Sequence, residues 1–402
     1  MRILYFGTVC DLNEYEKKLS DCGTKPSIAT IVFESSLLSG FRENGAQVDV
    51  YSYPMIPPFP RSKWLGWGAK REMLPCGYQC TWLKTLNVPI FKQLSRRLDC
   101  RRVLKKWLKE NAGEGLVFTY SIPPFLVKDI LKYTRAAGVK AVAIVPDLLR
   151  DMYINEKPGL LTKLKNCYLA PALALQGEYD GYVYLTEAMA DVVAPEKPYM
   201  VMEGIADIST AMLPVPKAAP RAIMYAGMLH EKFGILNLLD AFETLEADAQ
   251  LWLFGDGTAV PEIQRRARSN PRIQYFGMVP RQQILERERA AAVLVNPRSP
   301  GEEFTQYSFP SKTIEYMLSG TPLVTTRLPG IPAAYFDYVF PAESDSPQAL
   351  AAALNTALSM SDAQLDAFGC RARQFIIESK NSRSQSARIL KFMEEVKYGQ
   401  NR

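Results

Sequence analysis

Histidine is the scarcest residue in this 402-residue sequence, which contains only His230. A Ser-His-Asp triad, a histidine-rich metal site or a histidine proton relay would all have to use that one side chain. The seven cysteines are scattered along the chain. Cys76 and Cys80 are the only close pair, and no second Cys/His pair follows that would complete a zinc site. We therefore expect free thiols and no metal ion.

Long apolar runs are also missing, since none approaches the length needed to span a bilayer. The apolar start of the chain is followed by Asp11 without a cleavage-site pattern, so we predict a buried strand there and not a signal peptide. A content of 48% hydrophobic and 22% charged residues is typical of a globular enzyme. The predicted location is the cytoplasm, with peripheral contact at the inner face of the plasma membrane as a further hypothesis.

Nucleotide-binding fingerprints of the G-x-G-x-x-G and Walker types are absent as well, which disfavours NAD-type and P-loop sites. The sequence does alternate strand-like and helical segments. The alternation begins at Arg2–Phe6, which is followed by an expected polar loop at 7–26, and it starts again at Ala222–Ala226. This pattern is typical of parallel sheets covered by helices on both faces. Because 402 residues exceed one ordinary core, we predict two α/β domains, with the Pro/Ala-rich run 214–220 as a linker.

Acidic residues are scarce between Arg61 and Lys109, where only Glu72 and Asp99 accompany a long series of lysines and arginines. Four of the five tryptophans lie in this basic stretch, namely Trp64, Trp67, Trp82 and Trp107. Basic charge mixed with aromatic side chains suits an anionic membrane surface, and we predict peripheral membrane contact through 61–109. A solvated basic face with core tryptophans is the alternative. No nucleic-acid module is recognisable, so no nucleic-acid partner is expected.

The stretch 296–326 has the pattern of a polar loop followed by an amphipathic helix and a strand. The helix begins near Pro310, and a helix N-terminus is a ready anion site. Ser311 and Lys312 are expected to point donors outward there. Glu315 lies one turn further in, where its carboxylate would accept hydrogen bonds from sugar hydroxyls. An ordinary capped helix is the alternative.

Glycine-bearing turns follow three strand-like runs in the second half. They contain Gly227, the pair Gly255 and Gly257, and Gly277. Glycine at the carboxyl end of a strand lets a ligand approach the backbone. Each turn alone is weak evidence, since Gly-Asp-Gly is more often an ordinary tight turn. His230 follows the first of these turns and is either a phosphate or sugar contact or incidental.

Four segments of the second half have a specific order and spacing. They are Tyr225–Gly234 (YAGMLHEKFG), Leu253–Gly257 (LFGDG), Phe276–Val279 (FGMV) and Phe309–Pro322 (FPSKTIEYMLSGTP). Together they resemble the donor half of family 4 glycosyltransferases of the GT-B fold, through about Gly330. The likeness is closest to the bacterial exopolysaccharide and capsule branch, in which Glu-Glu-Phe precedes Ser-Phe-Pro-Ser-Lys. The first half is similar only in the order of its strands and helices.

The resemblance implies two doubly wound, Rossmann-like domains that face a central cleft. Residues 1–205 would bind the acceptor and 206–383 the nucleotide-sugar donor, while the terminal helix, 384–402, would cross back to the first domain. It also implies retaining transfer of a sugar, most often from a UDP-sugar, to an acceptor hydroxyl. Front-face attack lets the departing phosphate oxygen take the acceptor's proton, so a chain with one histidine can perform it. Family members of this kind need no metal, and no cofactor besides the nucleotide sugar is implied.

Site residues are carried over by position. Glu315 would hold the ribose hydroxyls, Ser311 and Lys312 the diphosphate, and Gly277 and Val279 the base. Lys232 would neutralise the leaving pyrophosphate, a preorganised electrostatic role. The predicted donor site comprises Gly227, Gly255, Gly257, Gly277, Val279, Arg298, Phe309, Ser311, Lys312 and Glu315. The predicted catalytic residues are Lys232, Glu303 and Asp147.

The sequence departs from the family pattern on the sugar-facing side. The family commonly has a glutamate eight residues before the one matching Glu315, and Tyr307 stands there. Glu303, in a longer loop, is the candidate replacement. Asp147 is the nearest counterpart of a family histidine near the sugar, and a helix cap is the alternative.

The usual basic positions also differ. The basic residue after the glycine is replaced by Met228, and the second basic position falls on Phe233, so Lys232 is offset by one. Arg298 is the candidate for the missing positive charge.

The predicted function is therefore a retaining glycosyltransferase that adds one sugar to a saccharide or lipid-linked saccharide in exopolysaccharide or capsule assembly. A catalytically inactive GT-B protein that acts as a scaffold in the same assembly is the alternative. Nucleotide-sugar epimerases share the architecture but depend on a richer set of His and acidic residues.

Overall fold

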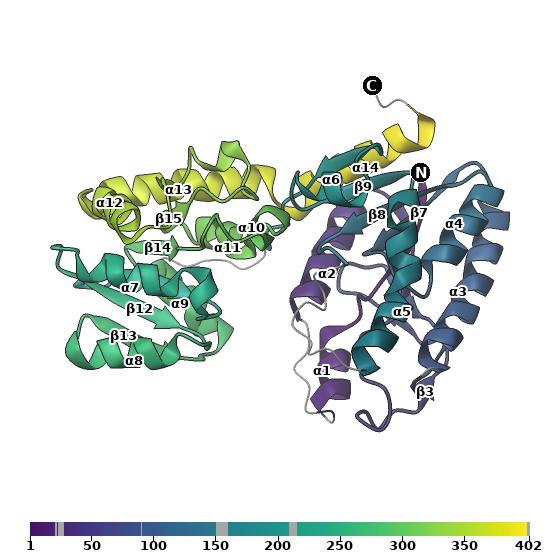
Figure 1. Cartoon of the computed structure of the whole chain (residues 1–402). Coiled ribbons are helices and arrows are strands. Elements are labelled where there is room, and N and C mark those ends of the chain that lie inside the picture. The colour runs from purple at the N-terminus through teal and green to yellow at the C-terminus, as the bar shows by residue number, and fades with distance from the viewer. Residues whose placement is uncertain (21, 23–27, 90, 150–159, 209–214, 400–402) are drawn as a thin grey trace. The chain divides into compact units, whose positions relative to one another are not determined.

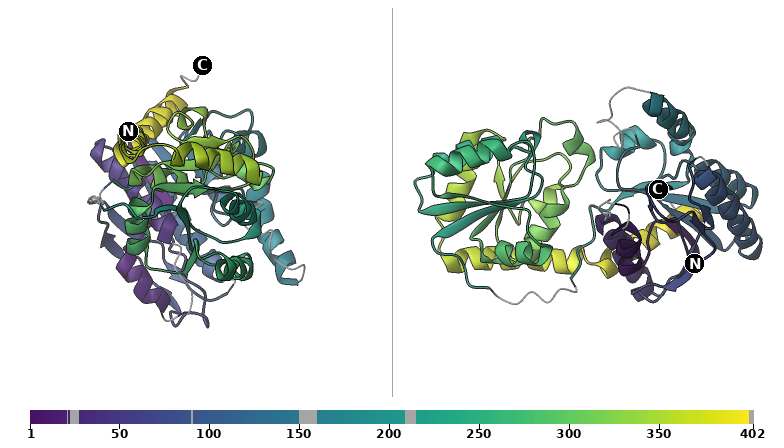
Figure 2. Two further views of the ribbon diagram at one scale, coloured as in Figure 1. Left: turned by 90° about the vertical axis from the view of Figure 1, so that its left-hand side faces the viewer. Right: turned by 90° about the horizontal axis from the view of Figure 1, so that it is seen from below.

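The chain forms two compact units, Met1–Ile205 with Ser382–Arg402 and Ala206–Asn381 (Figure 1). The computed structural model describes residues 1–402 except 21, 23–27, 90, 150–159, 209–214 and 400–402. Each unit contains a parallel sheet between helices, which confirms the predicted class of two doubly wound α/β units (Figure 2). The linker prediction begins at 214, outside the described residues. The roles assigned to the units and the cleft between them stay predictions.

The first unit is built on a sheet of order β10-β9-β8-β7-β1-β2-β5-β4, in which only β4 is antiparallel to its neighbour. Its strands are β1 (Arg2–Gly7), β2 (Gln47–Ser52), β4 (Arg71–Met73), β5 (Gln79–Trp82), β7 (Gly115–Tyr120), β8 (Lys140–Val145), β9 (Gly181–Tyr184) and β10 (Tyr199–Val201), with β3 (Gly66–Trp67) and β6 (Thr85–Leu86) forming a separate pair. Its helices are α1 (Leu12–Ser20), α2 (Ile28–Glu43), α3 (Phe91–Glu110), α4 (Val127–Ala136), α5 (Leu160–Leu175), η2 (Gln176–Glu178), α6 (Met189–Val193) and α14 (Ser382–Tyr398).

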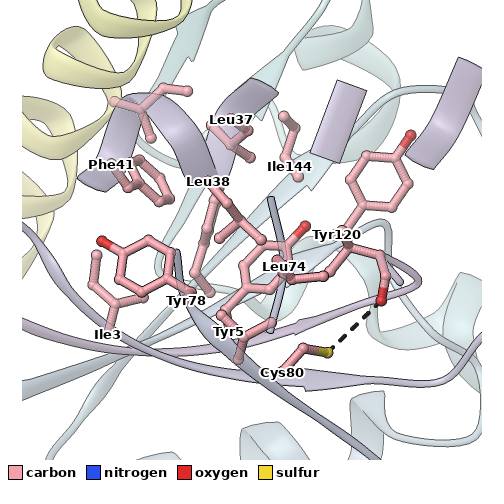
Figure 3. Packing of buried hydrophobic residues seen from close by; sticks show 14 of the residues in the cluster. Ile3, Tyr5, Leu37, Leu38, Phe41, Leu74, Tyr78, Cys80, Tyr120 and Ile144 are labelled. Atoms are coloured by element: carbon pink, nitrogen blue, oxygen red, sulfur yellow. Dashed lines mark hydrogen bonds between the residues drawn. The ribbon is translucent and has the colours of Figure 1, made fainter. Parts of the chain in front are cut away.

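The central strands of this sheet are buried on both faces, because helices cover both sides. Every residue of β7 is buried, as are all but the first of β1 and β8. The core brings Tyr5 and Phe41 against Phe118, with ring centroids 5.9 and 6.0 Å apart, and Figure 3 shows Tyr5, Phe41 and their neighbours. A fully buried side chain of this size contributes about 1.5–3 kcal/mol.

Helix α14, although last in sequence, packs on α2, β8, β9 and β10 of the first unit. Ile389, Phe392, Met393 and Val396 are buried at a helical spacing. Ser386 Oγ donates to the carbonyl of Leu37 at 3.0 Å. The apolar stripe of α14 therefore completes the core of the first unit.

Two segments of the first unit differ from the sequence expectation. The expected loop at 7–26 contains α1, whose Tyr15 and Leu19 are buried four residues apart, a spacing that the sequence did contain. The basic stretch contains the short strands β3 to β6. Two of its tryptophans, Trp82 and Trp107, are core residues, so the tryptophan argument for a membrane surface is wrong for these two.

The second unit contains a parallel sheet of order β13-β12-β11-β14-β15-β16. Its strands are β11 (Arg221–Ala226), β12 (Ala249–Phe254), β13 (Ile273–Gly277), β14 (Val293–Asn296), β15 (Leu323–Thr326) and β16 (Phe340–Ala342). Its helices are η3 (Glu231–Phe233), α7 (Ile235–Glu243), α8 (Val260–Ser269), α9 (Arg281–Ala290), α10 (Phe304–Tyr307), α11 (Ser311–Ser319), η4 (Ala333–Tyr335), α12 (Pro347–Leu358) and α13 (Asp362–Ser379). Contacts of α7 with α12, and of α11 with α9 and α13, form its helical layers.

Candidate functional site

In the second sheet the order in which the chain adds strands reverses between the two central strands, β11 and β14. Chain order runs outward from β11 through β12 to β13 on one side and from β14 through β15 to β16 on the other. In open parallel sheets, ligands bind at such a switch point, beyond the carboxyl ends of the strands. The loops after β11 and β14 meet there, and they carry Lys232, Arg298 and Glu303.

The glycine turns interlock through their main chains. Gly227 N donates to Phe254 O at 3.0 Å, and Gly255 N donates to Gly277 O at 2.8 Å. A Cβ added to Gly255, which has a φ of 129°, would lie 1.8 Å from Gly227 O, and one added to Gly257 would lie 2.4 Å from Leu229. Close packing of the chain therefore requires glycine at 255 and 257. The predicted donor contact of these glycines stays a prediction.

Helix α11 is fixed over the end of β11 by Tyr316. The fully buried Tyr316 hydroxyl accepts from Ala226 N at 2.9 Å and donates to Ala226 O at 3.1 Å. Phe309, just before the helix, is buried against Tyr335 with ring centroids 5.4 Å apart. Phe309 thus packs in the core and anchors the start of α11.

The N-terminus of α11 has the features of an anion site. Its cap residue is Pro310, and among the described residues no side chain caps the helix. The first main-chain N–H groups therefore stay available, and the helix dipole favours negative charge at this position.

Lys312 is directed along α11 and does not point outward as expected. Its ammonium donates to Glu315, one turn on, and lies 3.6 Å from a carboxylate oxygen of Glu288 on α9. Arg281, also on α9, lies 3.6 Å from the other oxygen of Glu315. Glu315 is therefore surrounded by two cations and a second acid.

Glu288 is fully buried, and among the described residues no donor reaches either of its oxygens at hydrogen-bond distance. Burial, followed by the nearby charge of Glu315, raises the pKa of Glu288 to about 9. Burial alone would raise the pKa of Glu315, but Lys312, a hydrogen bond from Glu288 and Arg281 lower it below its ordinary value. A protonated Glu288 that donates to an ionised Glu315 satisfies both groups, and it holds Glu315 as a pure acceptor.

Replacing Glu288 with glutamine should stabilise the protein at alkaline pH. The folded protein keeps a proton on Glu288 that the unfolded chain loses above its ordinary pKa of about 4.3, so wild-type stability should fall between about pH 4 and pH 9. Glutamine keeps the donor and does not titrate. In urea unfolding at pH 8, the free energy of unfolding of Glu288→Gln should exceed that of wild type by at least about 1 kcal/mol. The difference should be smaller at pH 5. Glu286→Gln, on an exposed residue of α9, is the control. Equal destabilisation by Glu288→Gln at both pH values would contradict the assignment.

Lys232 and Arg298 gather around one aromatic ring. The Lys232 ammonium lies 5.4 Å, and the Arg298 guanidinium 5.0 Å, from the centroid of Phe233. Phe233 packs edge-on against Phe304 at the start of α10, with centroids 5.6 Å apart. Among the described residues, no carboxylate pairs with either cation, and burial lowers the pKa of Arg298. Two positive groups at the switch point are therefore available to an anion.

The residues around this site also match a known family. Residues 220–360 match the family model of glycosyl transferases group 1. The matched residues lie within the second unit, which is therefore similar to the glycosyl transferases of group 1. No curated protein matches the sequence at the significance required.

Solved structures match this chain over nearly its whole length. The sucrose-phosphate synthase of Thermosynechococcus elongatus superposes with a TM-score of 0.60 at 13% identity, covering 100% of both chains. HepE of Anabaena, in complex with UDP, gives 0.60 at 14% identity, covering 98% of this chain and 100% of that one. The apo lipopolysaccharide outer core galactosyltransferase WaaB gives 0.58 at 15% identity, covering 100% of both. At these identities the likeness establishes the fold, which is GT-B.

Glu303, a predicted sugar contact, precedes Phe304, whose ring centroid lies 5.9 Å from the Lys232 ammonium. Glu303 is exposed immediately before α10, and Tyr307 ends that helix half-buried. His230 Nδ1 accepts from Thr258 N at 3.1 Å. Val279 is half-buried in the loop after β13. The ligand contacts of all four stay predictions.

Asp147 belongs to the other unit. It follows β8 and lines a cavity at the carboxyl edge of the first sheet.

The sequence interpretation missed Glu288, Arg281 and Tyr316, which support the predicted site. Arg281 and Glu288 lie in a highly charged helical segment, which in the sequence looks like a solvent-exposed helix face. Nothing in the sequence apart from their position on helices points to these three residues.

Proposed function

We propose that this protein is a retaining glycosyltransferase that moves a sugar from a UDP-sugar to an acceptor hydroxyl without a metal ion. One observation carries the proposal. At the switch point of the second sheet, the loops after β11 and β14 bring together two cations, Lys232 and Arg298, that have no carboxylate partner among the described residues, and the second loop leads on to the uncapped N-terminus of α11. Such a site suits a diphosphate that gains charge as it departs.

The roles follow the chemistry of each group. The N–H groups at Ser311 and Lys312 bind the diphosphate, and Lys232 with Arg298 stabilises it as the leaving group. Ionised Glu315 accepts from the ribose hydroxyls. Glu303, on the loop after β14, contacts the transferred sugar, and the departing phosphate oxygen takes the acceptor's proton.

Structural relatives support the choice of donor. Anabaena HepE has been solved with UDP and with UDP-glucose. For this chain we propose UDP as the nucleotide, Gly277 and Val279 as its base contacts, and a lipid-linked saccharide in exopolysaccharide or capsule assembly as the acceptor. The enzyme would work in the cytoplasm.

A screen of UDP- and GDP-sugars for hydrolysis, combined with calorimetry of UDP, tests the proposal. Binding of UDP in the micromolar range and slow release of UDP from one sugar nucleotide are expected. The departure at Tyr307 favours the second candidate, an inactive GT-B scaffold. UDP binding without turnover of any donor in the presence of saccharide acceptors would favour the scaffold. Absence of UDP binding would refute both the donor site and the transferase.

Peripheral membrane contact through 61–109 has support from exposed apolar residues. Phe91, Leu94 and Leu98, which are 53%, 50% and 54% exposed, form one stripe on α3. Further exposed apolar residues lie on the preceding segment, namely Met55, Phe59, Trp64, Leu65, Met73 and Leu86. Exposed apolar side chains among basic ones suit an anionic bilayer surface. No helix among the described residues is long and apolar enough to cross a membrane.

The double substitution Leu94→Ser and Leu98→Ser should weaken binding to vesicles of phosphatidylglycerol at least about tenfold, because each leucine would lose apolar burial in the bilayer. Flotation of the protein with vesicles measures this. Ile208→Ser removes an exposed apolar side chain, 45% exposed, from the second unit and should leave binding unchanged. Equal flotation of the double variant and wild type would rule out this surface.

A further inference from the structure

The first unit contains a cavity of about 530 Å³. Its lining comes from the loops that follow β1, β2, β7 and β8, joined by side chains of α3 and α5. The sheet order reverses between β1 and β7, so the cavity lies at the switch point of this sheet. A ligand site is therefore expected at this position on topological grounds, independently of the donor site in the second unit.

Much of the cavity wall is apolar. Its apolar residues include Pro58, Ile122, Pro123, Pro124 and Phe125. A wall of this kind binds hydrocarbon or the apolar face of a ligand and leaves few polar groups to set orientation.

The charged groups of the lining are unbalanced. They are Arg61, Lys92, Arg96 and a single acid, Asp147. Lys92 and Arg96 stand one turn apart on α3. Among the described residues no carboxylate forms an ion pair with either of them, although the same helix pairs Arg97 and Arg101 with Asp129.

Neutral groups fix these two cations in place. The Lys92 ammonium donates to the carbonyl of Ile56. Arg96, only 1% exposed, donates from Nη2 to Pro54 O at 2.7 Å and from Nε to Thr85 Oγ1 at 3.3 Å. No acceptor for its Nη1 is found among the described residues. The pair is therefore oriented, yet its charge is not neutralised.

Holding two like charges close together, one buried at Arg96 and one half-buried at Lys92, is costly. Burial, and then the charge of Arg96, lowers the pKa of Lys92 to about 7, and burial lowers the pKa of Arg96 to about 10. Buried charges are normally paired, because an unpaired ion loses its hydration without compensation. A bound anion would supply the missing charge and the missing acceptor.

The cationic side of the cavity adjoins exposed apolar surface. Met55 lines the cavity and is 60% exposed, and Phe91, next to Lys92, is 53% exposed. A ligand with an anionic group at Lys92 and Arg96 can therefore extend an apolar chain along these side chains to the outside.

We propose that this cavity binds the phosphate group of an amphipathic acceptor, a lipid phosphate, through Lys92 and Arg96. This inference rests on the proposed transferase function and names the class of its acceptor. The phosphate accepts from the Lys92 ammonium and from Arg96 Nη1, while the apolar wall binds the first part of the lipid.

Calorimetry with farnesyl phosphate, compared with inorganic phosphate and glucose 1-phosphate, tests the inference on the full chain. Wild type should bind farnesyl phosphate at least tenfold more tightly than either soluble phosphate. Lys92→Met should weaken farnesyl phosphate binding at least tenfold. Lys106→Met, which removes a lysine from the solvent-exposed side of the same helix, should leave it unchanged. Since Lys92→Met also removes a half-buried charge, its melting temperature should equal or exceed that of wild type.

Arg96→Lys is the second variant, because it keeps the charge while losing the planar donor pair, and it should also weaken farnesyl phosphate binding. Unchanged binding in a folded Lys92→Met protein, or equal affinity for all three phosphates, would overturn the inference. UDP calorimetry separates the two proposals. UDP binding without farnesyl phosphate binding overturns only this inference, and farnesyl phosphate binding without UDP binding overturns only the proposed donor site.

Discussion

Glu315→Gln is expected to reduce the affinity for UDP at least about tenfold. Glu315 is the ionised member of the buried acid pair, held as an acceptor by Lys312, Arg281 and protonated Glu288. A hydrogen bond to a charged acceptor contributes about 1.5–3 kcal/mol, and the neutral amide would also turn a donor toward the ribose hydroxyls. Calorimetry with UDP measures the loss.

Uridine makes this test specific, because it keeps the ribose and lacks phosphate. Glu315→Gln should weaken the binding of uridine and of UDP by similar factors if the side chain contacts the ribose. Glu286→Gln, on the exposed face of α9, is the matched control and should bind both ligands as wild type does. Unchanged UDP affinity in Glu315→Gln would remove the ribose contact from the proposed site.

Arg298→Met and Lys232→Met should each lower kcat for sugar transfer about 100-fold. Both cations lie beside Phe233 without a carboxylate partner among the described residues, so their charge is available to the departing diphosphate. Removing one preorganised donor from the charge that develops in a transition state typically costs about 10²–10³ in kcat. Methionine keeps much of the side-chain volume, and packing on Phe233 should survive in both variants.

Arg268→Met, at an exposed position of α8, is the control for loss of an arginine and should retain full activity. The ground-state contribution is separated by UDP calorimetry. If the cations act mainly on the leaving group, kcat should fall more than the affinity for UDP. A wild-type kcat in both variants would show that neither cation meets the diphosphate.

The sequence carried strong signals for the buried strands and for the amphipathic helix α11. Continuous apolar runs such as those of β7 and β14 are readable because both faces of a parallel strand are buried. The short strands β3 to β6 have no such run. Each is only two to four residues long, and β5 joins the main sheet through β2, which lies far away in sequence, so no local pattern predicts this part of the sheet.

Glu288 shows why part of the site could not be predicted from the sequence. In the segment Arg281–Ala290, RQQILERERA, it is one of several charged residues and looks solvated. Only the packing of α9 against α11 buries it beside Glu315, and a titratable group without solvent changes its protonation. The tryptophans of the basic stretch are a second case. Their composition suggested a membrane-facing surface, but packing places Trp82 and Trp107 in the core.

By itself, the sequence determined the two α/β units and the positions of Ser311, Lys312 and Glu315, because periodicity and motif spacing are local properties of the chain. The tertiary structure alone decided which charges are neutralised. Lys312 lies against Glu315 and Glu288, whereas Lys232, Arg298, Lys92 and Arg96 have no carboxylate partner among the described residues. Charge pairing depends on distances of a few ångströms between residues remote in sequence, and only the packed fold sets those distances.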